Sequence, residues 1–161
     1  MEQVEQSRGG EKIYMKESNY QFVDTNILVY AYDKSAGEKH VVAKQIVEEL
    51  WKERNGALST QVLQEFFVVV TKKVKNPITF DTAFQIISDL KLWKVATIEV
   101  EDILEAIKFS QRYKISFWDA LILCSAINLG CSIVWSEDLN SGQYFGKIKV
   151  VNPFLSSSLD I

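Results

Sequence analysis

The sequence predicts an α/β domain in which helices cover both faces of a central parallel sheet. Short apolar runs alternate along the chain with segments whose apolar residues recur at helical spacing, and this alternation is typical of parallel sheets. The chain has 161 residues, of which 47% are hydrophobic and 24% charged. That length and composition fit one globular domain with a full core.

The first half of the domain contains two predicted strand–helix pairs. Residues 21–23 begin an apolar run that predicts a buried strand, and residues 24–26 predict a polar turn that opens a helix. Helical spacing of apolar residues predicts a further helix over 41–51. Residues 56–58 predict a short strand, and the serine or threonine after it caps a helix over 59–73.

The middle of the chain continues this alternation. Asn76-Pro77 ends the preceding helix, because the residue before proline disfavours helical backbone angles. The next segments predict a helix over 79–90, a strand over 95–100 and an amphipathic helix over 102–113.

The most apolar segment, residues 117–135, is long enough to span a bilayer and carries one charge, Asp119. Residues 128–130 (Asn-Leu-Gly) are typical of a helix C-terminus, so we interpret the segment as a core helix followed by a core strand over 133–135. Residues 148–151 predict the last strand.

The two ends of the chain lack the apolar periodicity of the middle. We therefore divide the chain into a flexible extension (1–18), one folded domain (19–155) and a loose tail (156–161). No stretch at the start resembles a signal peptide, and two sparse cysteines fit a reducing compartment. We expect a soluble, cytoplasmic protein with no membrane association.

Composition excludes several classes of site. Cys124 and Cys131 are the only cysteines and His40 is the only histidine, which excludes a disulfide framework and a multi-histidine zinc site. Neither a G-x-G-x-x-G nor a G-x-x-x-x-G-K-[ST] phosphate loop occurs, which argues against dinucleotide and ATP sites of those kinds. With a net charge of −3, any nucleic-acid binding depends on local basic patches.

Two carboxylates follow predicted strands. Asp24 comes directly after the first strand, and Asp138 follows the strand at 133–135. Ligands of open parallel sheets bind outside the carboxyl ends of the strands, so both side chains are expected at one edge. Taken singly, each aspartate is more often a turn residue or a helix cap.

Glu65 and Asp119 are two further candidates. Glu65 lies within an apolar stripe, where an ionised carboxylate is unfavourable unless it is paired or bound to a cation. The alternative for Glu65 is a salt bridge to a lysine. Asp119 follows Ser116 at the spacing of a capping box, so a cap role is the alternative to a ligand role for it.

If these four acids lie close together, they form a candidate site for a divalent metal ion. Several carboxylates in one cleft repel one another unless a divalent cation lies between them. An all-oxygen ligand set without histidine or cysteine suits Mg²⁺ or Mn²⁺. A metal-bound water can become a hydroxide-like nucleophile, so the sequence predicts metal-assisted hydrolysis of a phosphodiester.

The same motifs resemble a known family. Residues 22–33 resemble the opening of PIN-domain nucleases, especially the VapC-type toxins of toxin–antitoxin pairs. Residues 117–120 and 136–140 resemble the third and fourth acidic motifs of that family, and Glu65 sits where the family has a glutamate. Residues 150–154 are similar to the final strand, so the resemblance covers nearly the whole domain.

The resemblance implies a three-layer α/β/α fold and a Mg²⁺- or Mn²⁺-dependent endoribonuclease. It implies a catalytic acidic cluster formed by Asp24, Glu65, Asp119 and Asp138. Of these, Asp24, Asp119 and Asp138 are the implied metal ligands, directly or through water. It further implies a homodimer, an RNA substrate and a cognate antitoxin protein that silences the enzyme. The implied supporting residues are Thr25, Asn26, Ser136 and Asn140.

Basic residues near the predicted site are candidates for phosphate contacts. The alternative is that they are solvated helix ends, where lysine and arginine favour the helix dipole. Trp93, Trp118 and Tyr144 are candidates for base stacking, with burial in the core as the alternative. The basic candidates are Lys72, Lys73, Lys75, Arg112 and Lys114.

Two other functions compete with a nuclease. An aspartyl-phosphate phosphatase also places an aspartate after the first strand, but it needs a second aspartate where this chain has Asn26. A partner-binding scaffold that retains the fold without activity is the non-enzymatic alternative, and the presence of all four acids argues against it.

Overall fold

The computed structural model describes residues 3–8, 11–16 and 19–155, with a six-stranded sheet at its centre. The strand order is β5-β4-β3-β6-β8-β7, and every neighbouring pair is parallel except β7 with β8. The strands are β3 (Gln21–Val23), β4 (Gly56–Ser59), β5 (Lys94–Ala96), β6 (Ile133–Trp135), β7 (Tyr144–Phe145) and β8 (Ile148–Val151).

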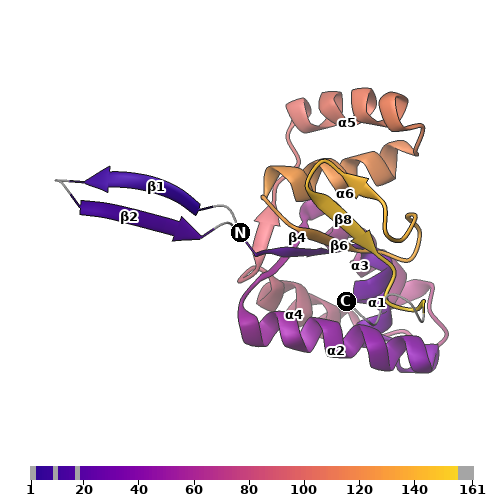
Figure 1. Cartoon of the computed structure of the whole chain (residues 1–161). Helices are drawn as coiled ribbons and strands as arrows, with labels where there is room; N and C mark the ends of the chain where they lie inside the picture. Colours follow the sequence, from indigo (N-terminus) through magenta and orange to yellow (C-terminus); the bar gives the residue numbers. More distant parts are fainter. Residues whose placement is uncertain (1–2, 9–10, 17–18, 156–161) are drawn as a thin grey trace.

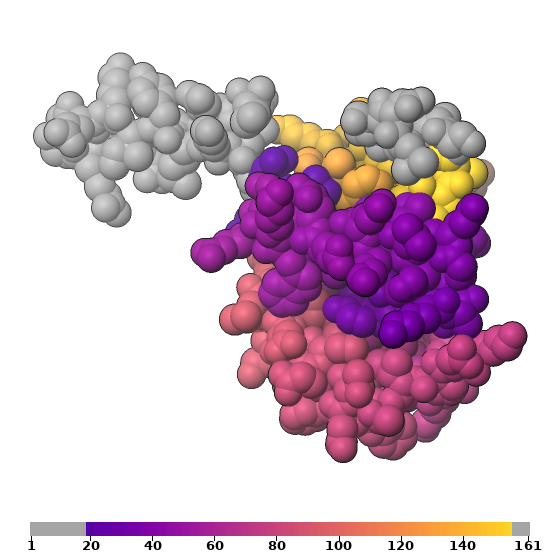
Figure 2. All heavy atoms as spheres, turned by 90° about the horizontal axis from the view of Figure 1, so that it is seen from below, coloured from indigo at the N-terminus to yellow at the C-terminus, as the bar shows by residue number. Residues whose placement is uncertain are grey.

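Helices cover both faces of this sheet, as the sequence predicted. Figure 1 shows α2 and α4 on one side and α5 and α6 on the other. Figure 2 views the molecule from below, where the first part of the domain (purple) and the region of α4 (pink) form a continuous surface. The helices are α1 (Thr25–Tyr32), the short 3-10 helix η1 (Lys34–Ala36), α2 (Glu38–Glu53), α3 (Thr60–Lys72), α4 (Phe80–Leu90), α5 (Val100–Tyr113) and α6 (Phe117–Asn128).

The predicted strand over 95–100 is wrong in its second half. β5 ends at Ala96, and α5 begins at Val100. The backbone N–H of Glu99 donates to the Asp102 carboxylate at 2.7 Å, which is the hydrogen bond of a capping box. The capping box of Glu99 and Asp102 therefore begins a helix within the segment that was predicted to be a strand.

The core consists of apolar side chains from the sheet and from the inner faces of the helices. Phe22 of β3, Phe66 of α3 and Leu123 of α6 are fully buried. The segment that was long enough to span a bilayer forms α6 and β6, which confirms its interpretation as core. Among the described helices, none has the length and apolar character needed to cross a membrane.

Trp93 belongs to this core and lies against Gly56 at the start of β4. Its ring packs edge-on against Trp51 with centroids 5.5 Å apart, so a base-stacking role for Trp93 is wrong. A Cβ atom added at Gly56 lies 2.6 Å from the Trp93 ring, which is closer than packed atoms tolerate. Glycine is therefore required here for the close approach of the indole.

Gly56→Ala is expected to destabilise the fold by about 1–3 kcal/mol, because the added methyl group overpacks a rigid ring. Urea denaturation of wild type and variant measures this change. The same substitution in a Trp93→Leu background, where a flexible side chain replaces the ring, is expected to have a smaller effect. An equal loss in both backgrounds contradicts the contact as the cause.

At the start of the chain, β1 (Gln3–Arg8) and β2 (Glu11–Lys16) form a separate antiparallel pair. Residues 1–18 were predicted to be a flexible extension, and that flexibility stays a prediction. The predicted loose tail, 156–161, lies outside the described residues.

Candidate active site

Three parallel strands end side by side at one edge of the sheet, and each is followed by a polar residue. Asp24 follows β3, Ser59 follows the apolar residues of β4, and Ser136 follows β6. The Asp24 N–H donates to the Trp135 carbonyl at 2.9 Å, so the end of β3 is fixed against the end of β6. This register places the residues after β3 and β6 next to each other.

Asp24 is the most buried acid at this edge, with 5% of its surface exposed. It is the N-cap of α1, and its Oδ1 accepts a hydrogen bond from the Thr25 N–H at 2.7 Å. Its Oδ2 accepts from the Ser136 hydroxyl, also at 2.7 Å. The pKa of Asp24 is raised from 3.8 to about 6, mainly by burial and to a lesser extent by the charges of Asp138 and Asp119, while the two hydrogen bonds lower it.

Asp138 is exposed and is held by two neutral groups. Asn26 donates from Nδ2 to the Asp138 carboxylate at 3.0 Å, and the Asp138 N–H donates to the Ser136 hydroxyl at 3.2 Å. Ser136 thus contacts both acids. The predicted supporting positions Asn26 and Ser136 hold Asp24 and Asp138 in place.

Glu65 comes from α3, and both of its carboxylate oxygens accept hydrogen bonds from neutral donors. Thr25 donates its hydroxyl to Oε2 at 2.7 Å, and Gln61 donates from Nε2 to Oε1 at 3.0 Å. Among the described residues, Glu65 forms no ion pair with a lysine, so the salt-bridge alternative for it is wrong. Its charge is left without a cationic partner there.

Asp119 lies in the first turn of α6, whose N-cap Ser116 accepts the Asp119 N–H at 3.1 Å. One of the two hydrogen bonds of the predicted capping box is therefore present, the one from the Asp119 N–H to the Ser116 hydroxyl. Burial raises the pKa of Asp119 above its ordinary value, hydrogen bonding of its carboxyl group with the Ser116 side chain lowers it, and the charges of Asp138 and Glu65 raise it. Asp119 is thus close enough to each of the other three acids for an electrostatic interaction.

Sequence reasoning missed the role of Glu137, which ties three segments together beside Asp138. Glu137 accepts hydrogen bonds from the Tyr30 hydroxyl at 2.7 Å and from Lys39 at 2.5 Å, and its N–H donates to Asn26 at 3.2 Å. The charge of Glu137 is therefore compensated by Lys39, unlike the charges of the four candidate acids.

The basic candidates lie at helix ends or in a loop, and in the part of the chain that the structure describes none of them forms an ion pair with the four acids. Lys72 and Lys73 are at the end of α3, roughly 10 Å beyond Glu65 along the helix axis at 1.5 Å per residue. Arg112 and Lys114 are exposed at the end of α5, just before the helix that carries Asp119. Lys75 is exposed in the loop after α3. Their contacts with RNA stay a prediction.

Three other candidates have different surroundings. Trp118, next to Asp119, is 62% exposed, and Tyr144 of β7 is exposed as well. Asn140 is exposed in the loop after Asp138, and its carbonyl accepts the Gln143 N–H at 3.3 Å. The orienting role of Asn140 stays a prediction.

Within the described part of the chain, no three His, Cys, Asp or Glu side chains are grouped tightly enough to form a ready-made metal cage. Mg²⁺ needs no such cage, because proteins usually hold it by one or two carboxylates while it keeps several waters. The donor set consists of oxygens alone, and no described lysine or arginine forms an ion pair with the four acids. These residues therefore fit a hard divalent cation in chemistry and in charge.

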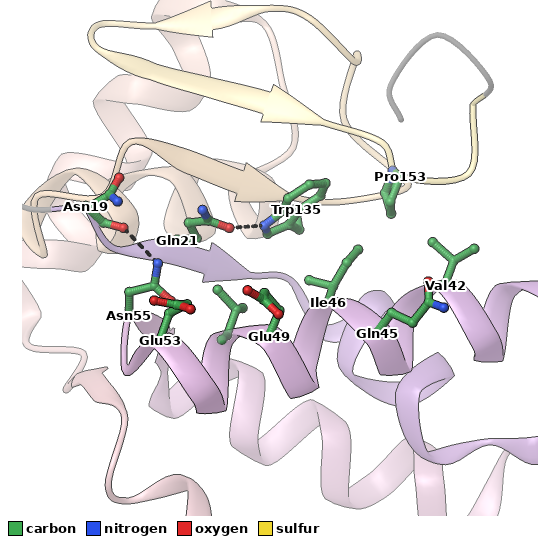
Figure 3. Close-up of a pocket in the computed structure, with 11 residues that line it drawn as sticks. Asn19, Gln21, Val42, Gln45, Ile46, Glu49, Glu53, Asn55, Trp135 and Pro153 are labelled. Atoms are coloured by element: carbon green, nitrogen blue, oxygen red, sulfur yellow. Dashed lines mark hydrogen bonds between the residues drawn. The ribbon is translucent and has the colours of Figure 1, made fainter. Parts of the chain in front are cut away.

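The cavity drawn in Figure 3 is a different place, between α2 and the sheet near the starts of β3 and β4. Gln21 accepts a hydrogen bond from the Trp135 indole there at 2.8 Å, and Glu49 and Glu53 of α2 line the opposite wall. None of the four candidate acids lines this cavity.

Similar structures come from toxin–antitoxin systems. A toxin–antitoxin complex from Klebsiella pneumoniae matches with a TM-score of 0.60 and 22% identity over 83% of this chain and 98% of that one. Mycobacterium tuberculosis VapC20, described as a sarcin-ricin loop cleaving toxin, matches at 0.58 and 18% over 73% and 89%. VapBC2 from Rickettsia felis, bound to a DNA fragment from its promoter, matches at 0.53 and 21% over 74% and 88%.

Sequence comparison defines the family. No curated protein sequence matches this chain. The family pattern described as the PIN domain matches residues 22–144, which include all four candidate acids. The resemblance found in the sequence motifs is confirmed by this match and by the shared fold: the chain belongs to the PIN domain family.

Proposed function

We propose that this protein is a Mg²⁺- or Mn²⁺-dependent endoribonuclease and the toxin of a toxin–antitoxin pair. One observation carries the proposal: hydrogen bonds through Ser136, Thr25 and Gln61 bring four carboxylates from separate elements together at the carboxyl edge of the sheet. No described cationic side chain pairs with these carboxylates. Uncompensated charge of this kind favours a bound divalent cation.

Each residue of the cluster has a defined task in this proposal. Asp24, Asp119 and Asp138 would hold the ion, directly or through water. The ion supplies Lewis acidity toward a phosphoryl oxygen and lowers the pKa of a bound water. Ser136 fixes the Asp24 carboxylate, and Thr25 fixes Glu65.

The substrate and partner rest on the similar proteins and on exposed side chains. The RNA-cleaving description of VapC20 supports an RNA substrate, and the exposed Trp118 beside Asp119 offers a surface on which a base can stack. The toxin–antitoxin complexes among the similar structures support a cognate antitoxin. We also propose a homodimer, for which the exposed apolar residues Phe80 and Phe84 of α4 offer contact area, and a cytoplasmic location.

Asp119→Asn tests the proposal, because it removes one carboxylate of the cluster without changing side-chain size. With Mn²⁺, the wild-type chain is expected to cleave RNA, and the variant is expected to lose at least about 100-fold of that rate, since several kcal/mol of metal-derived stabilisation are at stake. Gel analysis of a labelled RNA measures both rates.

Asp81→Asn is the matched control, because Asp81 is exposed on α4 and belongs to no cluster. It should cleave at the wild-type rate. Cleavage by the wild type that persists in excess chelator, or an Asp119→Asn variant with full activity, refutes the proposed site.

The two alternatives make different predictions. A scaffold retains its fold but does not bind Mn²⁺ in a calorimetric titration. A phosphatase of the aspartyl-phosphate type forms a phosphoenzyme on Asp24. The position where it needs a second acid is Asn26, and the amide of Asn26 is already engaged with Asp138, which disfavours this class.

A further inference from the structure

Gln61, in the first turn of α3, is a buried polar residue that none of the predicted roles includes. Only 5% of its surface is exposed. Its Nε2 donates to the Glu65 carboxylate at 3.0 Å and contacts the Trp118 carbonyl at 3.4 Å. Its Oε1 is buried and has no hydrogen-bond partner among the described residues.

The two acceptors fix the orientation of this amide. If the group rotated by 180°, its oxygen would face the Glu65 carboxylate and the Trp118 carbonyl, both of which are acceptors. The orientation that leaves Oε1 without a partner is therefore the one that the neighbours impose.

A buried acceptor without a partner is unfavourable, and an apolar side chain of the same size avoids that penalty. Departures from such packing rules concentrate at functional sites. The stability of the fold alone does not account for a glutamine here, so the reason lies in what its nitrogen holds.

The nitrogen holds two elements of the acid cluster. Together with Thr25 from α1, it gives each oxygen of Glu65 one neutral donor, which fixes the carboxylate without neutralising its charge. Its contact with Trp118 links the start of α3 to the first turn of α6, the turn that carries Asp119.

We propose that Gln61 is a positioning residue of the metal site: it holds Glu65 in place and ties α3 to the first turn of α6, and thereby sets how Glu65 faces Asp119. Gln61 acts through these acids and does not touch the substrate. This inference rests on the proposed function, because the arrangement that it fixes is that of the cation-binding acids.

Gln61→Leu separates this role from a structural one. The dissociation constant for Mn²⁺, measured by calorimetry, is expected to rise about 10–100-fold, as for groups that orient metal ligands. The thermal midpoint of the metal-free protein is expected to change little, since removal of the orphaned acceptor offsets the loss of the two contacts that Nε2 makes. Raising the Mn²⁺ concentration should restore RNA cleavage in this variant.

Gln64→Leu is the matched control, because Gln64 is the exposed glutamine on the same helix. It should bind Mn²⁺ like the wild type. If Gln61→Leu does not fold, Gln61→Met, which keeps the length of the side chain, is measured in the same way. An unchanged dissociation constant in the folded variant overturns the inference, whatever happens to the midpoint. Absence of Mn²⁺ binding by the wild type refutes the proposed function itself, which is a distinct result.

Discussion

Asp24→Asn is expected to abolish RNA cleavage and to stabilise the metal-free protein at neutral pH. The loss of activity, at least about 100-fold, follows from removal of the most buried carboxylate of the cluster. The gain in stability follows from its pKa, which burial raises from 3.8 to about 6. An ionised Asp24 is unfavourable in the folded state, and a neutral asparagine avoids this penalty.

The raised pKa of Asp24 determines how the stability difference between Asp24→Asn and the wild type changes with pH. Because the folded-state pKa lies above the unfolded one, the stability that protonated Asp24 contributes is fully present below pH 3.8 and is lost as pH rises through about 6. At about 1.4 kcal/mol per pKa unit, the wild type loses up to about 3 kcal/mol by pH 7.5. Asp24→Asn should therefore exceed the wild type by up to that amount at pH 7.5 and by little at pH 4.

Urea denaturation in the presence of a chelator, at pH 4.0, 5.5 and 7.5, measures this difference. Asp33→Asn is the control, because Asp33 is a buried aspartate that caps η1 through Ser35, outside the acid cluster. It should cleave RNA at the wild-type rate. An Asp24→Asn variant that is less stable than the wild type at pH 7.5 contradicts the account of Asp24 as an uncompensated charge.

Addition of Mn²⁺ is expected to stabilise the wild type strongly. A ligand that binds only the folded state at 100 times its dissociation constant adds about 2.7 kcal/mol to the free energy of unfolding. For a chain of this length, that is a rise of roughly 5–10 °C in the thermal midpoint. The rise should be smaller at pH 5, because protons compete with the ion for Asp24.

Thermal melts with and without Mn²⁺ test this expectation. Asp81→Asn should show the full rise, and Asp24→Asn should show little of it. Equal rises in the wild type and in Asp24→Asn would place the ion somewhere other than the acid cluster, and the removal of Mn²⁺ by a chelator should reverse the rise.

Patterns of apolar and polar residues predicted most of the strands and helices. They failed at the start of α5, where a capping signal and a strand signal overlap. The alternation of apolar and polar residues located β3, β4, β6 and β8, because buried strands and amphipathic helices differ in period. The boundary between β5 and α5 was missed, since the capping contact between Glu99 and Asp102 outweighs strand propensity. β7 has only two residues and pairs only because β8 lies beside it.

The candidate site was predictable only in part. An acid directly after a strand and an acid in the first turn of a helix are visible in the sequence, and so is the spacing of four residues between Gln61 and Glu65. The contact between Gln61 and Trp118 is not visible, because the two residues are 57 positions apart. The contacts of Glu137 with Tyr30 and Lys39 depend in the same way on which segments pack together.

By itself, the sequence determined the order of strands and helices and the position of an acid after β3 and after β6. Tertiary structure alone decided that β3 and β6 are neighbours, so that Ser136 donates to Asp24 across 112 residues of chain. Strand order depends on hydrogen bonds and packing between segments that are remote in sequence, and no local pattern encodes it. The burial that raises the pKa of Asp24 depends on the same packing.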